Sequence, residues 1–177
     1  MSSDFQRRKV AGVFTAMDVD GDGFLTEQDF RALTDRWTGI RGWASGTAGH
    51  EQLSAVMMGW WQTLLAVSDR NRDHKVSLDE VLLVVDGLSA QPAAVIGTAD
   101  AMFDAVDENA DGQISAAEYR QAIEAWTGRA TDIDGIFPIL DLNGDGHLSR
   151  EEFAELWTEF WAGDNPDAPG SLVFGRV

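Results

Sequence analysis

Residues Asp141–Glu152 read DLNGDGHLSREE, and this stretch decides the fold of the whole chain. Oxygen-bearing side chains occupy its positions 1, 3, 5 and 12, namely Asp141, Asn143, Asp145 and Glu152. Gly146 at position 6 can take the positive φ of a sharp turn, and His147 at position 7 offers its backbone carbonyl. A calcium ion takes about six to eight oxygen ligands, so a chain that wraps around it needs donors at such intervals. The stretch therefore predicts a calcium-binding loop.

Three further stretches repeat this spacing, beginning at Asp18, Asp69 and Asp107. They read DVDGDGFLTEQD, DRNRDHKVSLDE and DENADGQISAAE. Their candidate ligands, with position 7 contributing a backbone carbonyl, are Asp18, Asp20, Asp22, Phe24 and Asp29 in the first, Asp69, Asn71, Asp73, Lys75 and Glu80 in the second, and Asp107, Asn109, Asp111, Gln113 and Glu118 in the third. Each stretch follows the plan of the twelve-residue EF-hand loop, so the chain is an internal repeat predicted to bind up to four calcium ions.

The first two loops each depart from this pattern at one position. Asp29 stands at position 12 in place of glutamate, and its shorter side chain reaches an ion with one oxygen more easily than with two, which favours magnesium at the first loop. His74 stands at position 6 in place of glycine, where a positive φ costs about 1 kcal/mol. Arg70, Arg72 and Lys75 also place positive charge beside the second site. We expect the second loop to be the weakest site or close to it.

Amphipathic helices are expected on both sides of the loops. Before the first loop, apolar residues recur at helical spacing at Val10, Val13, Phe14 and Met17. The run 81–85, VLLVV, is apolar on every side and predicts a buried helix after the second loop. Gly39 is expected to end the helix after the first loop, and Trp43 to serve as a packed anchor in the glycine-rich connector 40–49. Pro138 limits the helix before the fourth loop to one or two turns, or bends it.

An aliphatic residue stands at position 8 of every loop. These residues are Leu25, Val76, Ile114 and Leu148. In paired EF-hands they join two loops through a short antiparallel strand contact, and a single hand cannot bury its apolar face alone. The sequence therefore predicts a compact all-α fold in which loops 18–29 and 69–80 form one pair and loops 107–118 and 141–152 form the other.

The best candidate boundary between the two pairs is Gln91-Pro92. It divides the chain into an N-terminal pair, residues 1–91, and a C-terminal pair, residues 92–163. The tail, residues 164–177, contains two prolines and two glycines, so no regular helix is expected there. Its apolar residues Leu172, Val173 and Phe174 leave two alternatives, a disordered tail or a tail folded back into a groove between hands.

The charge of the chain is strongly acidic, with 30 acidic against 13 basic residues and a net charge of −17. Such a balance argues against nucleic acid and anionic membranes as partners. Carboxylates clustered in the loops repel one another without metal, so metal binding and folding should be coupled. No cysteine is present, and we expect neither a signal peptide nor a membrane-spanning segment, which predicts a cytoplasmic location.

Enzymatic activity is not expected. The three histidines, His50, His74 and His147, lack the spacing of a catalytic zinc motif, and the chain contains neither a phosphate-cradling loop nor a cysteine nucleophile. The loop carboxylates are already assigned to metal ions.

Four such hands, with an extended first linker and an aromatic-rich interior, resemble the calerythrin and sarcoplasmic calcium-binding protein family. The resemblance covers nearly the whole chain. It implies a compact, helical, cytosolic calcium-binding protein of the buffer type, in which some hands do not bind calcium. It also implies the ligand roles given above, with Asp29 and His74 as the departures.

The leading functional hypothesis is a calcium buffer or transporter, expected to be a monomer. Seven Trp and nine Phe against five Met favour it, because calcium sensors expose flexible, Met-rich grooves. The alternative is a calcium-dependent regulator that binds a target protein through wide apolar helix faces such as that of residues 53–65.

Overall fold

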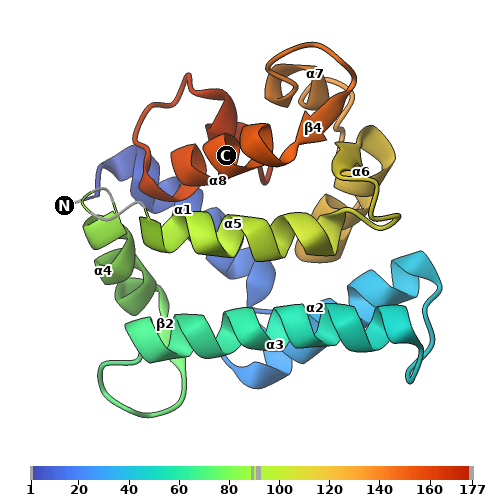
Figure 1. Ribbon diagram of the computed structural model, residues 1–177. Coiled ribbons are helices and arrows are strands. Elements are labelled where there is room, and N and C mark those ends of the chain that lie inside the picture. The colour runs from blue at the N-terminus through green and yellow to red at the C-terminus, as the bar shows by residue number, and fades with distance from the viewer. Residues whose placement is uncertain (1, 89, 91–92, 176–177) are drawn as a thin grey trace.

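A computed structural model describes residues 2–88, 90 and 93–175. Its helices are α1 (Asp4–Met17), α2 (Glu27–Arg41), α3 (Ala48–Ser68), α4 (Leu78–Leu88), α5 (Ala93–Val106), α6 (Ala116–Thr127), α7 (Phe137–Leu140) and α8 (Arg150–Ala162), followed by a short 3-10 helix, η1 (Pro169–Leu172). Its strands are β1 (Phe24–Leu25), β2 (Val76–Ser77), β3 (Gln113–Ser115) and β4 (His147–Ser149). Figure 1 shows α5 running between α3 and α8, so α5 packs against one helix from each half of the chain.

The short strands join the loops in pairs, as predicted. Strand β1 pairs antiparallel with β2, which places Leu25 opposite Val76. Strand β3 pairs antiparallel with β4, which places Ile114 opposite Leu148. All four side chains are fully buried, and burying each contributes about 1.5–3 kcal/mol. The predicted all-α fold of four EF-hands in two pairs is confirmed.

Helix α2 ends two residues later than predicted. It continues past Gly39 to Arg41, and Gly42 caps it with φ of 69°. Gly39 keeps a helical backbone, because a helix ends where the chain needs a left-handed residue rather than at the first glycine. The predicted anchor, Trp43, packs against the core, and a Cβ added to Gly49 would lie 2.9 Å from its ring.

Helix α4 contains the run 81–85, and the prediction of a buried helix holds for only part of this run. Val81, Leu82 and Val85 are buried, whereas Leu83 is 47% exposed. Helix α4 packs against α1, α3 and α8, which together cover only part of its circumference. Helix α7 is a single turn with Pro138 at its start, as predicted.

Aromatic rings fill the interior between the two pairs of loops. Trp60 on α3 lies 5.2 Å from Trp126 on α6 and 6.5 Å from Trp157 on α8, measured between ring centroids. Trp157 in turn lies 5.9 Å from Trp161. The predicted boundary at Gln91-Pro92 lies outside the described residues, so the division at this point stays a prediction.

The segment after α8 folds back over that helix. Ser171 and Val173 are buried, and the hydroxyl of Tyr119 on α6 donates a hydrogen bond to the carbonyl of Val173. The N–H of Gly170 donates to a carboxylate oxygen of Glu159 at 2.8 Å. Within the part of the chain that the structure describes, no helix has the length and hydropathy needed to span a membrane.

Candidate metal sites

The carboxylate at position 1 organises each loop. In the first loop, Asp18 accepts hydrogen bonds from the N–H groups of Gly21, Asp22 and Gly23 at 2.8, 3.1 and 2.8 Å. In the fourth loop, Asp141 accepts the corresponding bonds from positions 4, 5 and 6 at 2.9, 3.2 and 2.7 Å. These bonds wrap the backbone around the carboxylate and bring positions 1, 3 and 5 to the same side of the loop.

Positions 4 and 6 of every loop have a positive φ. Glycine occupies both in the first and fourth loops, at Gly21, Gly23, Gly144 and Gly146. In the second loop they are Arg72 and His74, with φ of 63° and 64°. The strain predicted at His74 is therefore present, and sequence reasoning missed the same strain at Arg72 and at Ala110 in the third loop. The signal was available, since position 4 is glycine in two of the four loops.

The residue at position 12 closes each loop through backbone hydrogen bonds. The Glu118 carboxylate accepts from the N–H of Glu108 at 3.0 Å and from that of Ser115 at 2.8 Å. Asp29 makes the corresponding contacts to Val19 at 3.0 Å and Thr26 at 2.8 Å. Although it is one methylene shorter, the aspartate connects the same two points of its loop and is buried.

Position 9 starts the exiting helix, a role that sequence reasoning missed. The hydroxyl of Ser115 accepts a hydrogen bond from the N–H of Glu118 at 3.2 Å, while the Glu118 carboxylate accepts from the N–H of Ser115. This is a capping box, and its signal is serine or threonine three residues before the acidic residue. The same pattern stands at 26–29, 77–80 and 149–152. The proposed metal ligand at position 12 thus also fixes the start of a helix.

The first loop holds the densest acidic cluster. Carboxylate oxygens of Asp18, Asp20 and Asp22 lie within 4.8 Å of one another, and among the described residues no other three acidic or imidazole side chains meet this closely. The other loops have asparagine at position 3, so they bring fewer carboxylates together. The N–H of Asp22 lowers the pKa of Asp20, but desolvation and the neighbouring carboxylates outweigh it and raise this pKa above its usual value. A cation would relieve that repulsion.

The position-7 residues lie at the paired strands, where their carbonyls were predicted as ligands. Phe24, Gln113 and His147 begin β1, β3 and β4, and Lys75 directly precedes β2. The ammonium of Lys75 lies 5.2 Å from the centroid of the Phe24 ring, in the partner loop. The predicted positive charge beside the second site is therefore attached to the first loop by a cation–π contact.

The predicted side-chain donors all lie within their loops, between an entering and an exiting helix. They are hard oxygen donors, as calcium and magnesium require, and no thiolate or imidazole is placed among them. Asp107, Glu118 and Glu152 are buried, whereas Asp20 and Asp22 are exposed. The residues present therefore fit a divalent cation in each loop.

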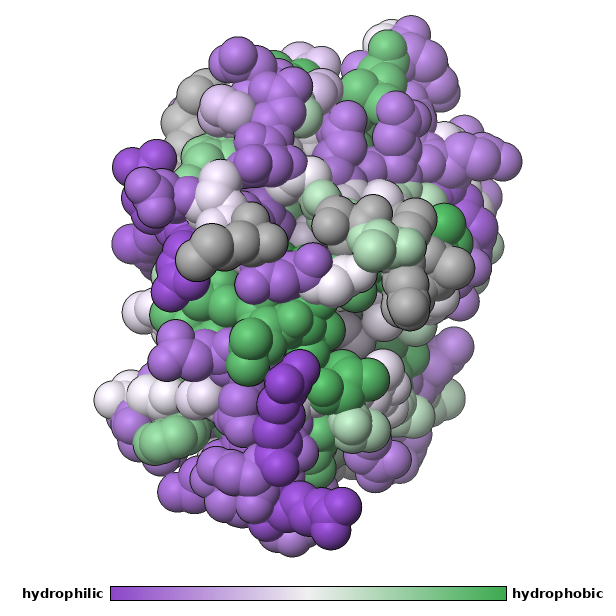
Figure 2. All heavy atoms as spheres, turned by 90° about the vertical axis from the view of Figure 1, so that its left-hand side faces the viewer, coloured by the Kyte–Doolittle hydropathy of each residue, from purple (hydrophilic) through white to green (hydrophobic). Residues whose placement is uncertain are grey.

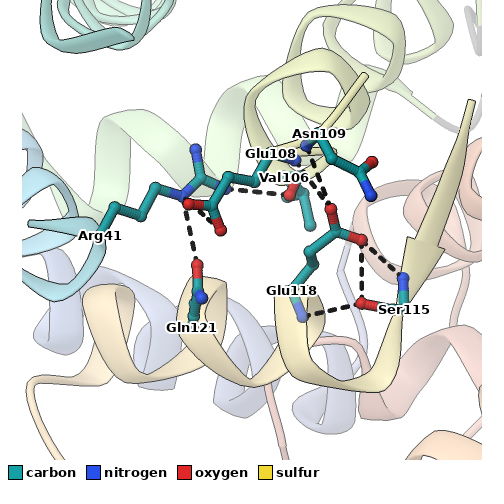
Figure 3. A network of polar contacts seen from close by, with 7 residues as sticks. All are labelled: Arg41, Val106, Glu108, Asn109, Ser115, Glu118 and Gln121. Atoms are coloured by element: carbon teal, nitrogen blue, oxygen red, sulfur yellow. Dashed lines mark hydrogen bonds and ion pairs between the residues drawn. The ribbon is translucent and has the colours of Figure 1, made fainter. Parts of the chain in front are cut away.

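Arg41 connects the end of α2 to the third loop (Figure 3). Its guanidinium donates to the carbonyl of Val106 at 3.0 Å and to the side chain of Gln121 at 3.3 Å, and it lies 3.8 Å from the carboxylate of Glu108. Only 2% of the Arg41 side chain is exposed. Burial lowers the pKa of Arg41, and the carboxylates of Glu108 and Glu118 oppose this effect. The Arg41 guanidinium thus links the first hand to the loop of the third.

Comparison with protein-family models matches residues 98–158 to an EF-hand domain pair and residues 10–34 to an EF hand. Among curated proteins, the chain is 28% identical over 174 residues to the sarcoplasmic calcium-binding protein alpha-B and -A chains of Penaeus sp., with 90% of each covered. The second loop, residues 69–80, lies outside both family matches, in agreement with its departures from the pattern.

Two solved structures show the same fold. The coelenterazine-binding protein of Renilla muelleri, in its calcium-loaded apo form, has a TM-score of 0.79 at 22% identity, with 99% of both chains covered. A sarcoplasmic calcium-binding protein from amphioxus has a TM-score of 0.75 at 20% identity, with 100% of both chains covered. The likeness in fold therefore extends over nearly the full length of the chain.

Proposed function

We propose that this chain, an EF-hand protein that resembles the sarcoplasmic calcium-binding proteins, is a cytoplasmic calcium buffer or carrier. The curated relatives are calcium-binding proteins and the matching family models are EF-hands. The chain is therefore a calcium-binding protein and not an enzyme. The buffer role goes beyond this and rests on one observation, the folded-back segment after α8.

That segment packs one of the chain's own aromatic side chains, Phe174, against the core of the C-terminal pair. The Phe174 ring lies 4.8 Å from Phe160, 5.6 Å from Trp126 and 5.7 Å from Trp157, measured between centroids. A calcium sensor exposes a hydrophobic groove to its target protein when calcium binds. Here a target would have to displace Phe174, and this supports storage of calcium rather than signalling.

The proposed ligands are the oxygens at positions 1, 3, 5, 7 and 12 of the four loops, for up to four ions. Calcium is proposed for the third and fourth loops, where glutamate at position 12 can offer both oxygens. Magnesium is proposed to compete at the first loop because of Asp29, and the second loop is proposed as the weakest because of Arg72 and His74. We expect a monomer whose folding is coupled to metal binding, since bound cations offset the clustered negative charge.

Calorimetric titration with calcium, in magnesium-containing buffer, tests this proposal. A second measurement adds a hydrophobic dye to the protein and compares the dye fluorescence in magnesium alone with that after calcium is added. The expected result is two to four tight sites and little calcium-dependent change in the dye signal. A large rise on adding calcium would mean that a groove opens, and the buffer role would then be wrong.

A calcium-dependent regulator is the second candidate. The observation in its favour is the exposed apolar side chains Leu83 and Ile96 on the neighbouring helices α4 and α5, which are 47% and 48% exposed. Pull-down experiments with and without calcium distinguish the two candidates. A partner retained only with calcium supports the regulator, and the same set of proteins under both conditions supports the buffer.

A further inference from the structure

Arg41 is a buried cation in a chain that has few basic residues, 13 against 30 acidic ones. Hydrophilic residues cover much of the face shown in Figure 2, as is usual for charged side chains, but only 2% of the Arg41 side chain is exposed. The residue stands at the last position of α2, the helix that leaves the first loop. A charge withdrawn from water needs compensating partners, and those of Arg41 gather at the third loop and the helix after it.

The carboxylates around the guanidinium belong to the third metal site or stand next to it. Burial lowers the pKa of the guanidinium, and the charges of Glu108, Glu118 and Asp107 oppose this effect. Figure 3 shows how Glu108 connects Arg41 to Glu118, since its carboxylate lies 3.8 Å from the guanidinium and its N–H donates to Glu118 at 3.0 Å. Glu118 and Asp107 are the proposed calcium ligands at positions 12 and 1. The guanidinium and a calcium ion are therefore attracted by the same group of carboxylates.

We propose that Arg41 is an internal counter-ion of the third loop and lowers the affinity of that loop for calcium. Its positive charge offsets part of the repulsion among the carboxylates before an ion binds, and it repels a divalent cation in the same place. Both effects shift the equilibrium toward the metal-free loop. The inference rests on the calcium site proposed for the third loop and adds to it a residue, supplied by the first hand, that sets its affinity.

The fourth loop is an internal reference for this role. Positions 1, 3, 5, 9 and 12 are Asp, Asn, Asp, Ser and Glu in both the third and the fourth loop. Position 2 is Leu142 in the fourth loop, where the third has Glu108. Over residues 2–88, 90 and 93–175, no ion pair joins a basic side chain to a carboxylate of the fourth loop. The two loops thus share their ligand types and differ in the buried counter-ion.

The test follows the third and fourth sites separately in the full chain. The N–H of Gly112 donates to Asp107 at 2.9 Å, so its amide NMR signal reports on the third site. The N–H of Gly146 donates to Asp141 at 2.7 Å and reports on the fourth site. Calcium is titrated in competition with a chelator of known affinity while both signals are recorded, which gives one affinity for each site.

The variant Arg41→Gln removes the charge, so calcium affinity at the third site should rise about fivefold while the fourth site keeps its affinity. Arg41→Lys keeps the charge and should have the native affinity. The matched control is Arg36→Gln, which changes the net charge by the same amount. Arg36 lies on the same helix and donates to the carbonyl of Ala125 on α6 at 3.0 Å, but none of the ion pairs among the described residues includes it. Its loss should leave the third site unchanged.

A purely structural role of Arg41 predicts the opposite direction, because loss of its bonds to the loop would weaken calcium binding in both Arg41 variants. That result, or an unchanged third site in Arg41→Gln, would overturn the role of Arg41 alone. A Gly112 signal that does not respond to calcium would overturn the third site itself and the inference with it. Should Arg41→Gln fail to fold, Arg41→Met fills the same space with an apolar side chain, and the same rise in affinity is expected.

Discussion

The backbone of the second loop bends at Arg72 and His74, where the first and fourth loops bend at glycine. Both residues hold a positive φ that side chains with a Cβ rarely adopt. The same side chains are individually ordinary for a surface loop, which is why the strain at Arg72 could not be recognised from its residue type. It becomes visible only when the four loops are aligned and position 4 is compared.

Replacing His74 by glycine should tighten calcium binding at the second loop. Relief of the left-handed strain contributes about 1 kcal/mol, or about fivefold in affinity, because the loop reaches its binding geometry more easily. Calorimetric titration of the variant measures this change. The reciprocal variant Gly146→Ala should weaken the fourth site by a similar factor, and unchanged affinities in both would show that the φ values are not limiting.

Replacing Asp29 by glutamate should shift the first loop toward calcium. Asp29 already connects the backbone of positions 2 and 9, so a glutamate at this point has the length to add a second oxygen ligand. We expect about a tenfold gain in calcium affinity, or about 1.4 kcal/mol, with little change for magnesium. Competition between the two ions, followed by calorimetry, measures the ratio. An equal gain for both ions would contradict this explanation.

At the scale of the helix, Lys9 joins α1 to the end of α8. It is 1% exposed, and its amine donates to the carbonyls of Glu159 at 3.3 Å and Gly163 at 3.1 Å. Desolvation lowers the pKa of Lys9 to about 8, although the charges of Asp164 and Glu159 oppose this. A neutral amine still has the two N–H groups that these carbonyls need.

The stability of the protein should therefore rise with pH through the window above pH 8. Between the folded pKa of about 8 and the usual lysine pKa of 10.5, the unfolded chain binds more protons than the folded one, so the free energy of unfolding increases with pH. Relative to the variant Lys9→Met, the native chain should gain about 1 kcal/mol between pH 7.5 and 9.5, after allowance for solvent screening. Denaturant unfolding of both proteins measures the difference, and a difference that does not vary with pH would contradict it.

The helices show how far pattern alone determines structure. The helical periodicity, the paired strands and the short α7 could be predicted, because they follow from residues close together in the sequence. The end of α2 and the exposure of Leu83 could not, because the first depends on where the backbone turns left-handed and the second on which helices lie opposite α4. The capping boxes were present in the sequence but were concealed by the ligand role of the same glutamates.

At the scale of the whole molecule, Arg41 connects the end of α2 to the third loop. Sequence periodicity does not predict that these two parts of the chain lie side by side. The Arg41 guanidinium satisfies the carbonyl of Val106 next to the third loop and is buried among helices α2 and α6. Pairings of this kind depend on which helix faces meet across the interior. The packing of Phe174 against the core likewise follows from that arrangement.

Replacing Arg41 by glutamine should destabilise the protein by about 2–3 kcal/mol. The change removes a charged donor and leaves the Val106 carbonyl unpaired in a buried place. Thermal unfolding in saturating magnesium measures the loss. The matched control, Arg31→Gln, removes an exposed ion pair with Glu27 and should change stability by less than about 0.5 kcal/mol. Equal effects of the two variants would mean that the Arg41 contacts add nothing.

The neighbouring indoles of α3, α6 and α8 give the protein a collective optical property. Trp60 lies 5.2 Å from Trp126 and 6.5 Å from Trp157, and Trp157 lies 5.9 Å from Trp161. At such separations the excitation energy of one indole transfers to its neighbours before a photon is emitted. The tryptophan fluorescence of the chain therefore comes from the group of rings as a whole. A quencher beside any one of these rings lowers the emission of the others, so the fluorescence intensity is sensitive to changes anywhere in this part of the interior.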